Sequence, residues 1–269
     1  MNNQLEKAER FRALHARRDA FILPNPWDRG SARLLAQAGF EALATTSAGY
    51  AFSLGLRDNA VGRERMLAHV AELASATELP LSVDLENGFG HDPETVAETI
   101  RLTASAGAVG GSIEDATGDP AHPLYDLDRA VMRIRAAAEA ARALPFPFTL
   151  TARAENFLVG KPDLDDVIAR LRAYQEAGAD VLYAPGLQSH EQIDAVLRAL
   201  DRPLNVLASA AFDRATLAHM GVRRISVGGA LTRAAYGALL RAAREMRERG
   251  TFEFAKDAVS HRDIEAMLG

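Results

Sequence analysis

The sequence contains no cysteine among its 269 residues. Disulfide bridges, cysteine-ligated zinc and thiolate nucleophiles are therefore excluded. An excess of basic residues is also lacking, because 31 Lys and Arg stand against 36 Asp and Glu and the formal net charge is -5. Such a chain has no general attraction for nucleic acid or for anionic membranes, so we expect neither as a partner.

Long apolar runs are absent too, since none approaches the roughly 20 residues that a membrane-spanning helix needs. The arginine-rich opening segment, residues 1–20, carries Glu6, Glu9 and Asp19, and no apolar signal core follows it. These features argue against a targeting peptide and favour a short amphipathic helix on a cytoplasmic protein. Low-complexity stretches and Pro/Gly-rich linkers are missing as well, so we expect a single domain over residues 1–269.

What the sequence does contain is a repeat of strand-like and helix-like segments. Gly39, Gly107, Gly178 and Gly221 each end a helical stretch just before a strand-like segment, as a left-handed helix cap does. This alternation predicts a (β/α)8 TIM barrel, with a doubly wound open sheet as the main alternative. The eight segments rich in apolar and β-forming residues are 21–25, 42–47, 81–86, 110–116, 148–155, 181–186, 204–209 and 224–229.

Acidic side chains gather at the ends of two of these segments. Asp84 and Glu86 end the third, and Glu114 lies near the end of the fourth. Residues two apart on a strand share a face, and the carboxyl ends of parallel strands meet at one rim. We therefore expect three converging carboxylates, a set that suits Mg2+ or Mn2+. Helix capping or pairing with arginine is the structural alternative.

Other polar residues are expected at the same rim. Arg153, on the fifth segment, neutralises the acids, binds a substrate carboxylate or enolate, or does both, since the two readings are not exclusive. After the second segment, the small residues Ser47, Ala48 and Gly49 allow backbone N–H groups to approach an anion. Asp58 lies further along the same long loop, residues 45–59, and is a candidate lid residue.

Two further loops contain residues whose function the sequence indicates less specifically. His122 stands between prolines after the fourth segment, where it is either a proton carrier on a closing loop or an inert surface residue. Residues 226–233, "SVGGALTR", are either a phosphate cradle at a helix start or a tight turn. Trp27, the single tryptophan, follows the first segment and is expected near a bound substrate.

Four motifs, "VDLENGFG", "GGSIEDA", "LTARAE" and "EAGADVLYAPG", follow one another on consecutive strands. In this order they resemble the isocitrate lyase/phosphoenolpyruvate mutase superfamily, and the likeness runs from residues 24–40 to residues 224–239. The resemblance implies a barrel whose eighth helix is exchanged between subunits. It thus implies C-terminal helices, from about residue 230, that take part in a homodimer or homotetramer.

The resemblance also implies Mg2+ that grips a small 2-oxo or 2-hydroxy acid. It assigns the metal site to three acids, held directly or through water, and the substrate to Arg153 and to amides after the second strand. It places Asp58 on the gating loop. The metal-site acids it implies are Asp84, Glu86 and Glu114, and the amides are those of residues 47–49.

The chain departs from the superfamily pattern in the loop after the fourth strand. Lyases of the superfamily carry a Lys-x-Cys-Gly-His motif there, whereas this loop reads "TGDPAHPLYD" and the mutase signature with asparagine is also absent. Glu86 stands where the best-known members have aspartate. The general acid or base of the known lyases therefore has no direct counterpart here.

These features together predict a Mg2+-dependent lyase that makes or breaks a carbon-carbon bond of a small 2-oxo or 2-hydroxy dicarboxylic acid through an enolate. The reaction would be isocitrate/methylisocitrate lyase-like or oxaloacetate decarboxylase-like. Decarboxylation needs little beyond an electron sink, whereas retro-aldol cleavage also needs a base, for which Tyr50 and His122 are candidates. The alternatives are a phosphonopyruvate or phosphoenolpyruvate mutase or hydrolase, and a 2-oxo acid binding barrel without turnover.

Overall fold

A computed structural model describes residues 2–269, and eight parallel strands form its centre. Neighbouring strands pair in the order β1-β8-β7-β6-β5-β4-β3-β2, and a hydrogen bond from Ala44 N to Pro24 O, 3.0 Å long, joins the two ends. The predicted (β/α)8 barrel is confirmed. Its strands are β1 (Phe21–Leu23), β2 (Leu43–Ala44), β3 (Leu81–Asp84), β4 (Gly110–Glu114), β5 (Thr149–Arg153), β6 (Val181–Tyr183), β7 (Leu204–Leu207) and β8 (Arg224–Ser226).

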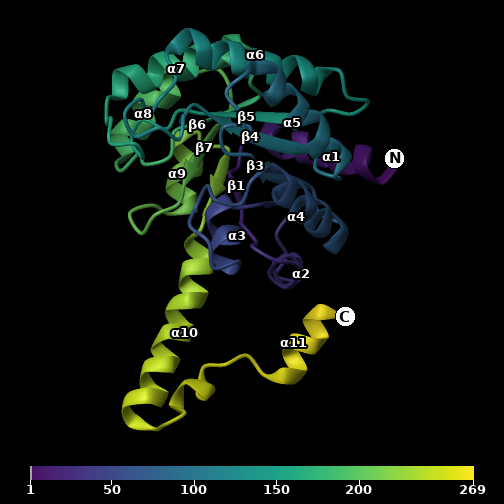
Figure 1. Cartoon of the computed structure of the whole chain (residues 1–269), viewed down its shortest axis with the longest axis vertical. Helices are drawn as coiled ribbons and strands as arrows, with labels where there is room; N and C mark the ends of the chain where they lie inside the picture. Colours follow the sequence, from purple (N-terminus) through teal and green to yellow (C-terminus); the bar gives the residue numbers. More distant parts are fainter. Residues whose placement is uncertain (1) are drawn as a thin grey trace.

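Helices surround the strands over most of the barrel (Figure 1). The most extensive contact between helices joins α5 to α6, and buried apolar side chains form a large core around the barrel with a second, smaller cluster beneath α1. The helices are α1 (Asn2–Ala16), α2 (Arg29–Gln37), α3 (Ser47–Ser53), α4 (Arg63–Ala76), α5 (Pro93–Ser105), α6 (Leu127–Arg142), α7 (Leu164–Glu176), α8 (His190–Ala199), α9 (Arg214–Met220), α10 (Ala230–Arg249) and α11 (His261–Leu268), with a 3-10 turn at Glu253–Lys256.

The eight strands lie where the sequence predicts them, but each is shorter than its predicted segment. The second segment shows the reason most clearly: Thr46 caps the N-terminus of α3 by accepting a hydrogen bond from Gly49 N, so the chain turns helical at Ser47. The prediction of an open loop over residues 45–59 was therefore wrong in its first half. This early helix brings backbone N–H groups to the rim of the barrel.

The four predicted helix caps are confirmed. Gly39, Gly107, Gly178 and Gly221 all have positive φ, between 87° and 110°, a region that glycine enters without steric cost. At Gly107 an added Cβ would meet Ala74 Cβ at 2.9 Å, so this site needs glycine for space as well as for conformation.

The predicted opening helix is also present, and α1 closes the amino-terminal end of the barrel. Phe11 and His15 are buried on it, and their rings make edge-to-face contacts with each other and with Phe21 of β1. Phe11 lies so close to Gly110 of β4 that a Cβ there would come within 2.9 Å of its ring. The lumen is therefore closed below, and a ligand enters from the carboxyl ends of the strands.

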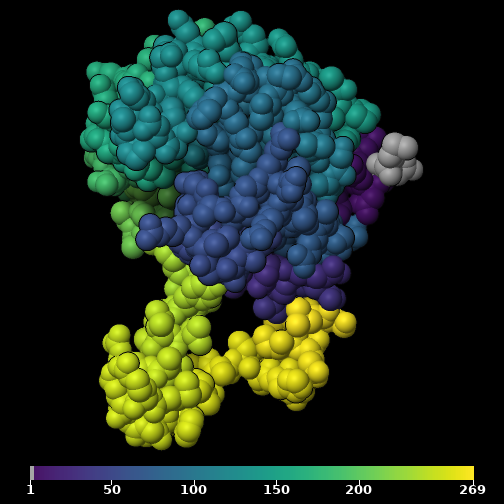
Figure 2. Space-filling model, viewed as in Figure 1, coloured from purple at the N-terminus to yellow at the C-terminus, as the bar shows by residue number. Residues whose placement is uncertain are grey.

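The C-terminal helices form an arm that leaves the barrel. In Figure 1, α10 runs outward from β8 and the chain returns to α11, which contacts α2. Figure 2 shows this arm as a projection separated from the rounded body over most of its length. Within residues 2–269, no helix combines the length and the apolar character needed to cross a bilayer.

Candidate active site

A cavity of about 190 Å³ opens at the carboxyl ends of the strands, and all eight strands contribute residues to its wall. The position is where enzymes with this fold carry out their chemistry. Its charged lining residues are Asp58, Asp84, Arg153 and Arg224.

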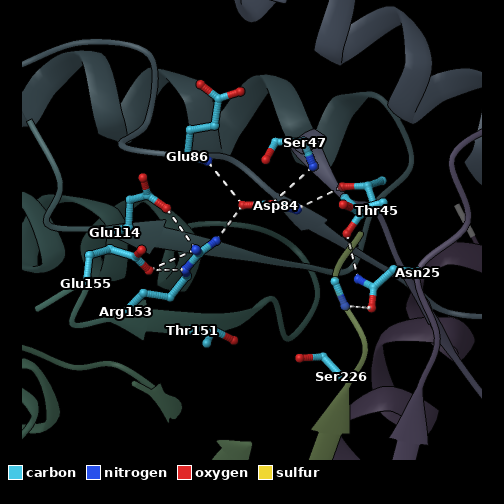
Figure 3. A network of polar contacts seen from close by, with 12 residues as sticks. Asn25, Thr45, Ser47, Asp84, Glu86, Glu114, Thr151, Arg153, Glu155 and Ser226 are labelled. Carbon is cyan, nitrogen blue, oxygen red and sulfur yellow. Dashed lines mark hydrogen bonds and ion pairs between the residues drawn. The ribbon is translucent and has the colours of Figure 1, made fainter. Parts of the chain in front are cut away.

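Arg153, the last residue of β5, is the centre of the charged network (Figure 3). Its Nη1 lies 2.7 Å from Asp84 Oδ1, and its Nη2 lies 3.1 Å from Glu114 Oε2. Its Nε donates to Glu155 Oε1 at 2.8 Å. All four side chains are largely buried, and the pKa of Arg153 is raised because three carboxylates outweigh the effect of desolvation. The neutralising role left open from the sequence is thus the one seen here.

Asp84 is held from its other side by the start of α3. Ser47 N donates to Asp84 Oδ2 at 3.2 Å, and Asp84 N donates to Thr45 Oγ1 at 2.9 Å. The positive end of a helix therefore faces this carboxylate. Of the amides predicted to hold a substrate anion, that of Ser47 contacts Asp84 and that of Gly49 contacts Thr46 Oγ1 at 3.1 Å.

Glu86 does not share a strand face with Asp84, and that expectation was wrong. The strand ends at Asp84, and Glu86 adopts a φ of 50°, so its side chain turns away from Asp84, as Figure 3 shows. Its amide still reaches Asp84 Oδ1 at 3.4 Å. Its Oε1 is buried and has no hydrogen-bond partner in the described part of the chain. Burial, followed by the charges of Asp84 and Asp58, raises the pKa of Glu86 to about 7.

Glu114 lies on the far side of Arg153 from Asp84. Its pKa is raised, chiefly because it is desolvated, although Arg153 opposes the shift. Within residues 2–269 no three Asp, Glu or His side chains are gathered closely enough to enclose a metal ion together. Asp84 lines the cavity described above, whereas Glu86 and Glu114 line a neighbouring pocket, and the Arg153 guanidinium pairs with both Asp84 and Glu114. The three acids therefore do not form a closed cage.

Asp115 is a buried residue at the end of the fourth predicted strand to which the sequence assigns no role. Its Oδ1 accepts from Glu155 N at 2.8 Å, and its Oδ2 accepts from Tyr174 Oη at 2.5 Å and from Arg170 Nη1 at 3.1 Å. This fixes the ends of β4 and β5 relative to each other and so positions Glu114 and Glu155. The sequence does contain a signal for this role. Asp115 directly follows Glu114, so the alternation of side chains along a strand turns it towards the helices.

Asp58 lies in the cavity wall, as expected for a residue on a loop over the rim. Burial raises its pKa, while a hydrogen bond from the Ser47 side chain lowers it in part. Ser47 and Ala48 also line the cavity.

Like Glu86, Glu114 and Gly49, the predicted residues Tyr50, His122 and Trp27 lie outside the cavity wall. The Tyr50 ring stacks on His69 with 3.7 Å between ring centroids. His122 has a side chain that is 84% exposed, and its ring lies 3.3 Å from Asp119 Oδ2 of the same loop. Trp27 is half-buried beside Gly49. The structure does not bring Tyr50, His122 or Trp27 to the carboxylates.

The turn before α10 has its amides satisfied within the protein. Val227 N and Gly228 N both donate to Asn25 Oδ1, at 2.9 and 2.8 Å. Of the two readings of residues 226–233, a tight turn accounts for this contact and leaves these two donors unavailable to a phosphate.

Comparison with known proteins gives the family. A model of the family described as phosphoenolpyruvate phosphomutase matches residues 11–247. This chain belongs to that family, and with it to the isocitrate lyase/phosphoenolpyruvate mutase superfamily. The resemblance noted in the sequence is confirmed.

Relatives within this superfamily have several kinds of activity. The chain is 33% identical to an oxaloacetate decarboxylase of Paraburkholderia xenovorans over 82% of this chain and 75% of that protein. A solved structure from Burkholderia cenocepacia, described provisionally as a lyase/mutase, is 62% identical, with a TM-score of 0.98 over 100% of this chain and 98% of that one. A phosphonopyruvate hydrolase solved with oxalate and Mg2+ is 25% identical, with a TM-score of 0.87 over 98% and 95%.

Proposed function

We propose that this protein is a Mg2+-dependent carbon-carbon lyase acting on a small 2-oxo or 2-hydroxy dicarboxylic acid, with oxaloacetate decarboxylase-like chemistry as its best-supported form. The residues that line the cavity are the main support for decarboxylase-like chemistry. They include Asp84 and Arg153 but neither Tyr50 nor His122, the two candidate bases that a retro-aldol cleavage requires. The similarity to an oxaloacetate decarboxylase supports the same choice.

The residues present fit a magnesium ion that keeps part of its water shell. Mg2+ binds through one or two carboxylates and completes its octahedron with water and substrate oxygens, so a closed protein cage is not required. Asp84 would hold it directly, with Glu86 and Glu114 acting through water. Glu86 Oε1 is a buried acceptor to which no donor among residues 2–269 is hydrogen-bonded. The relative solved with oxalate and Mg2+ supports the choice of metal.

A bound Mg2+ would supply a Lewis acid for the carbonyl oxygen of the substrate. The Arg153 guanidinium, already fixed by three carboxylates, stabilises negative charge that develops on the substrate beside it. When the bond to the departing carboxylate breaks, its electron pair moves into the enolate and CO2 leaves. Asp58, whose pKa is raised by burial, lies in the cavity wall and returns a proton to carbon.

A panel of 2-oxo and 2-hydroxy acids, assayed with Mg2+ and again with EDTA, tests this proposal. We expect turnover of an oxaloacetate-like acid that EDTA abolishes, and loss of turnover in Asp84→Asn. Asp119→Asn, on the exposed loop of His122, is the matched control and is expected to behave as wild type. Turnover that survives EDTA, or an active Asp84→Asn variant, would contradict the proposal.

Carbon-phosphorus chemistry is the second candidate, because one relative is a phosphonopyruvate hydrolase. Phosphorus NMR of an incubation with phosphonopyruvate separates the two. A new phosphate or phosphoenolpyruvate signal would favour this candidate, and an unchanged spectrum excludes it.

A further inference from the structure

Arg224 is a second buried arginine in the same cavity, and neither the sequence motifs nor the proposed chemistry gives it a role. It is the first residue of β8, is 4% exposed, and lines the cavity together with Arg153. Its side chain lies within the barrel lumen, where the interior of this fold is usually filled by branched apolar residues.

All the partners of Arg224 are neutral. Its Nε donates to Asn205 Oδ1 and its Nη2 to Thr151 Oγ1, both at 2.9 Å. Its Nη1 lies 3.4 Å from His15 Nε2. Nδ1 of His15 lies 2.8 Å from Phe11 O, which fixes the proton on Nδ1 and leaves Nε2 as the acceptor. Burial and the nearby Arg224 lower the pKa of His15 to about 3, so this ring is uncharged at neutral pH.

Arg224 therefore has a buried charge without a counter-ion. Over residues 2–269, the ion pairs of the protein include three carboxylates at Arg153 but none at Arg224. Burial lowers the pKa of Arg224 to about 10, which still leaves it protonated at neutral pH. Taking a guanidinium out of water is unfavourable unless an anion compensates it. Three neutral acceptors satisfy some of its five N–H groups but supply no charge.

The position of Arg224 relative to Arg153 fits a short molecule with an anion at each end. Thr151, which contacts Arg224, precedes Arg153 by two residues on β5, so the two sites are separated by about 7 Å along the strand. In Figure 3, Thr151 and Ser226 lie below Arg153, on the side away from Glu86. Small side chains, Ser82, Ser112 and Ser226, line the cavity and leave this space open.

We propose that Arg224 is a specificity-determining residue that binds the second anionic group of the substrate, while the first is held at the Asp84–Arg153 end of the cavity. Asn205 and Thr151 hold the guanidinium in place, and Ser226, whose Oγ accepts from Asn205 Nδ2 at 2.9 Å, completes the polar wall. The site thereby selects dicarboxylates over monocarboxylates of the same length. This inference rests on the proposed function only in that a 2-oxo or 2-hydroxy acid occupies the cavity.

Calorimetric binding of malate and 2-hydroxybutanoate in the presence of Mg2+ tests the inference without any turnover. The two acids differ in one distal group, carboxylate against methyl. We expect wild type to bind malate about 10-fold or more tighter than 2-hydroxybutanoate, and Arg224→Met to lose this preference. Oxalate, which is too short to reach Arg224, is the matched ligand control and should bind both proteins within about 2-fold.

Asn205→Asp provides a second variant in case Arg224→Met fails to fold. It is isosteric and places a carboxylate at the position 2.9 Å from Arg224 Nε, so it neutralises the guanidinium within the protein. We expect the same selective loss of malate binding. A malate preference that persists in either folded variant overturns the role of Arg224. Wild type that binds malate and 2-hydroxybutanoate equally overturns this inference alone, whereas wild type that binds neither contradicts the proposed function as well.

Discussion

Arg153 shows how a single side chain determines the electrostatics of the site. Its guanidinium contacts carboxylates from β3, from β4 and from the segment after β5, all of them largely buried. Like charges gathered in a low-dielectric region repel each other unless a cation lies among them. The protein supplies one such cation itself, and we have proposed that a metal ion supplies another.

Replacing Arg153 by methionine should therefore change both activity and stability. We expect Arg153→Met to lose turnover and about 3 kcal/mol of unfolding free energy, because three buried carboxylates lose their cation. Mg2+ should raise the melting temperature of this variant more than that of wild type, since the acids then depend on the metal. Thermal denaturation with and without Mg2+ measures this, and equal shifts in the two proteins would argue against metal binding at these acids.

His69 gives a prediction for acid pH. Burial lowers its pKa from 6.5 to about 4, its ring stacks on Tyr50, and its buried Nε2 has no hydrogen-bond partner among the residues described. Between these two values the unfolded chain binds a proton that the folded chain does not. The stability linked to His69 is therefore present above pH 6.5 and is lost as the pH falls towards 4.

His69→Phe should remove this acid sensitivity. Between pH 7 and pH 5 it should lose about 2 kcal/mol less unfolding free energy than wild type does. Urea denaturation at the two pH values measures the difference. His122→Phe, at an exposed position, is the control, and a His69→Phe variant as acid-sensitive as this control would refute the assignment.

The sequence predicted which residues lie at the site better than it predicted how their side chains are arranged. The acids Asp84, Glu86 and Glu114 lie at the same rim, because the carboxyl ends of parallel strands must meet, but Glu86 and Glu114 line a pocket beside the one that Asp84 lines. The prediction that Asp84 and Glu86 share a strand face was wrong, because nothing in the sequence shows that a non-glycine residue adopts a φ of 50° there. Arg224 escaped notice because nothing in the sequence shows that a strand arginine lacks an acidic partner.

The helix ends show which elements the sequence determines locally. The four glycine caps were predictable, because a left-handed residue between a helix and a strand is a local requirement. The lengths of the strands were not predictable, because they depend on where neighbouring strands stop pairing. The helix α3 was hidden because Ser47 to Ser53 contains small residues that are equally common in loops.

The helix caps Gly107 and Gly39 have similar backbone conformations but differ in the space around them, so their alanine variants can be compared. Both Gly107→Ala and Gly39→Ala introduce strain at positive φ, with an expected cost of about 1 kcal/mol each. Only at Gly107 does the new methyl meet another side chain, Ala74 Cβ at 2.9 Å, whereas Gly39 has open space. We expect Gly107→Ala to cost about 1 to 3 kcal/mol more in chemical denaturation. Equal losses of unfolding free energy in the two variants would show that the contact with Ala74 does not restrict which residue fits at Gly107.

The C-terminal arm raises the question of assembly at the scale of the whole molecule. Large apolar side chains remain exposed along it, including Leu239 at 61%, Leu240 at 64% and Phe252 at 67%. Exposed apolar groups gathered on one projecting segment mark an interaction surface. We propose that the arm packs on a second copy of the chain, as the exchanged eighth helix implied by the superfamily would, and that residues 1–269 otherwise act as one domain.

Leu240→Glu together with Phe252→Glu tests this assembly. We expect wild type to sediment as a dimer or tetramer at micromolar concentration and the double variant to sediment as a monomer. Glu248→Gln, also on α10, is the control and should leave the assembly unchanged. A wild-type monomer would contradict the proposal, as would a double variant that still assembles.

Asp84 and its neighbours are proposed to bind a divalent cation together with a small 2-oxo acid. Titration of Mn2+ followed by electron paramagnetic resonance, with and without oxalate, tests this binding most directly. We predict one bound Mn2+ per chain, tighter binding when oxalate is present, and loss of that binding in Asp84→Asn. Wild type that leaves all Mn2+ free in solution, or an Asp84→Asn variant that binds it equally well, would contradict the account.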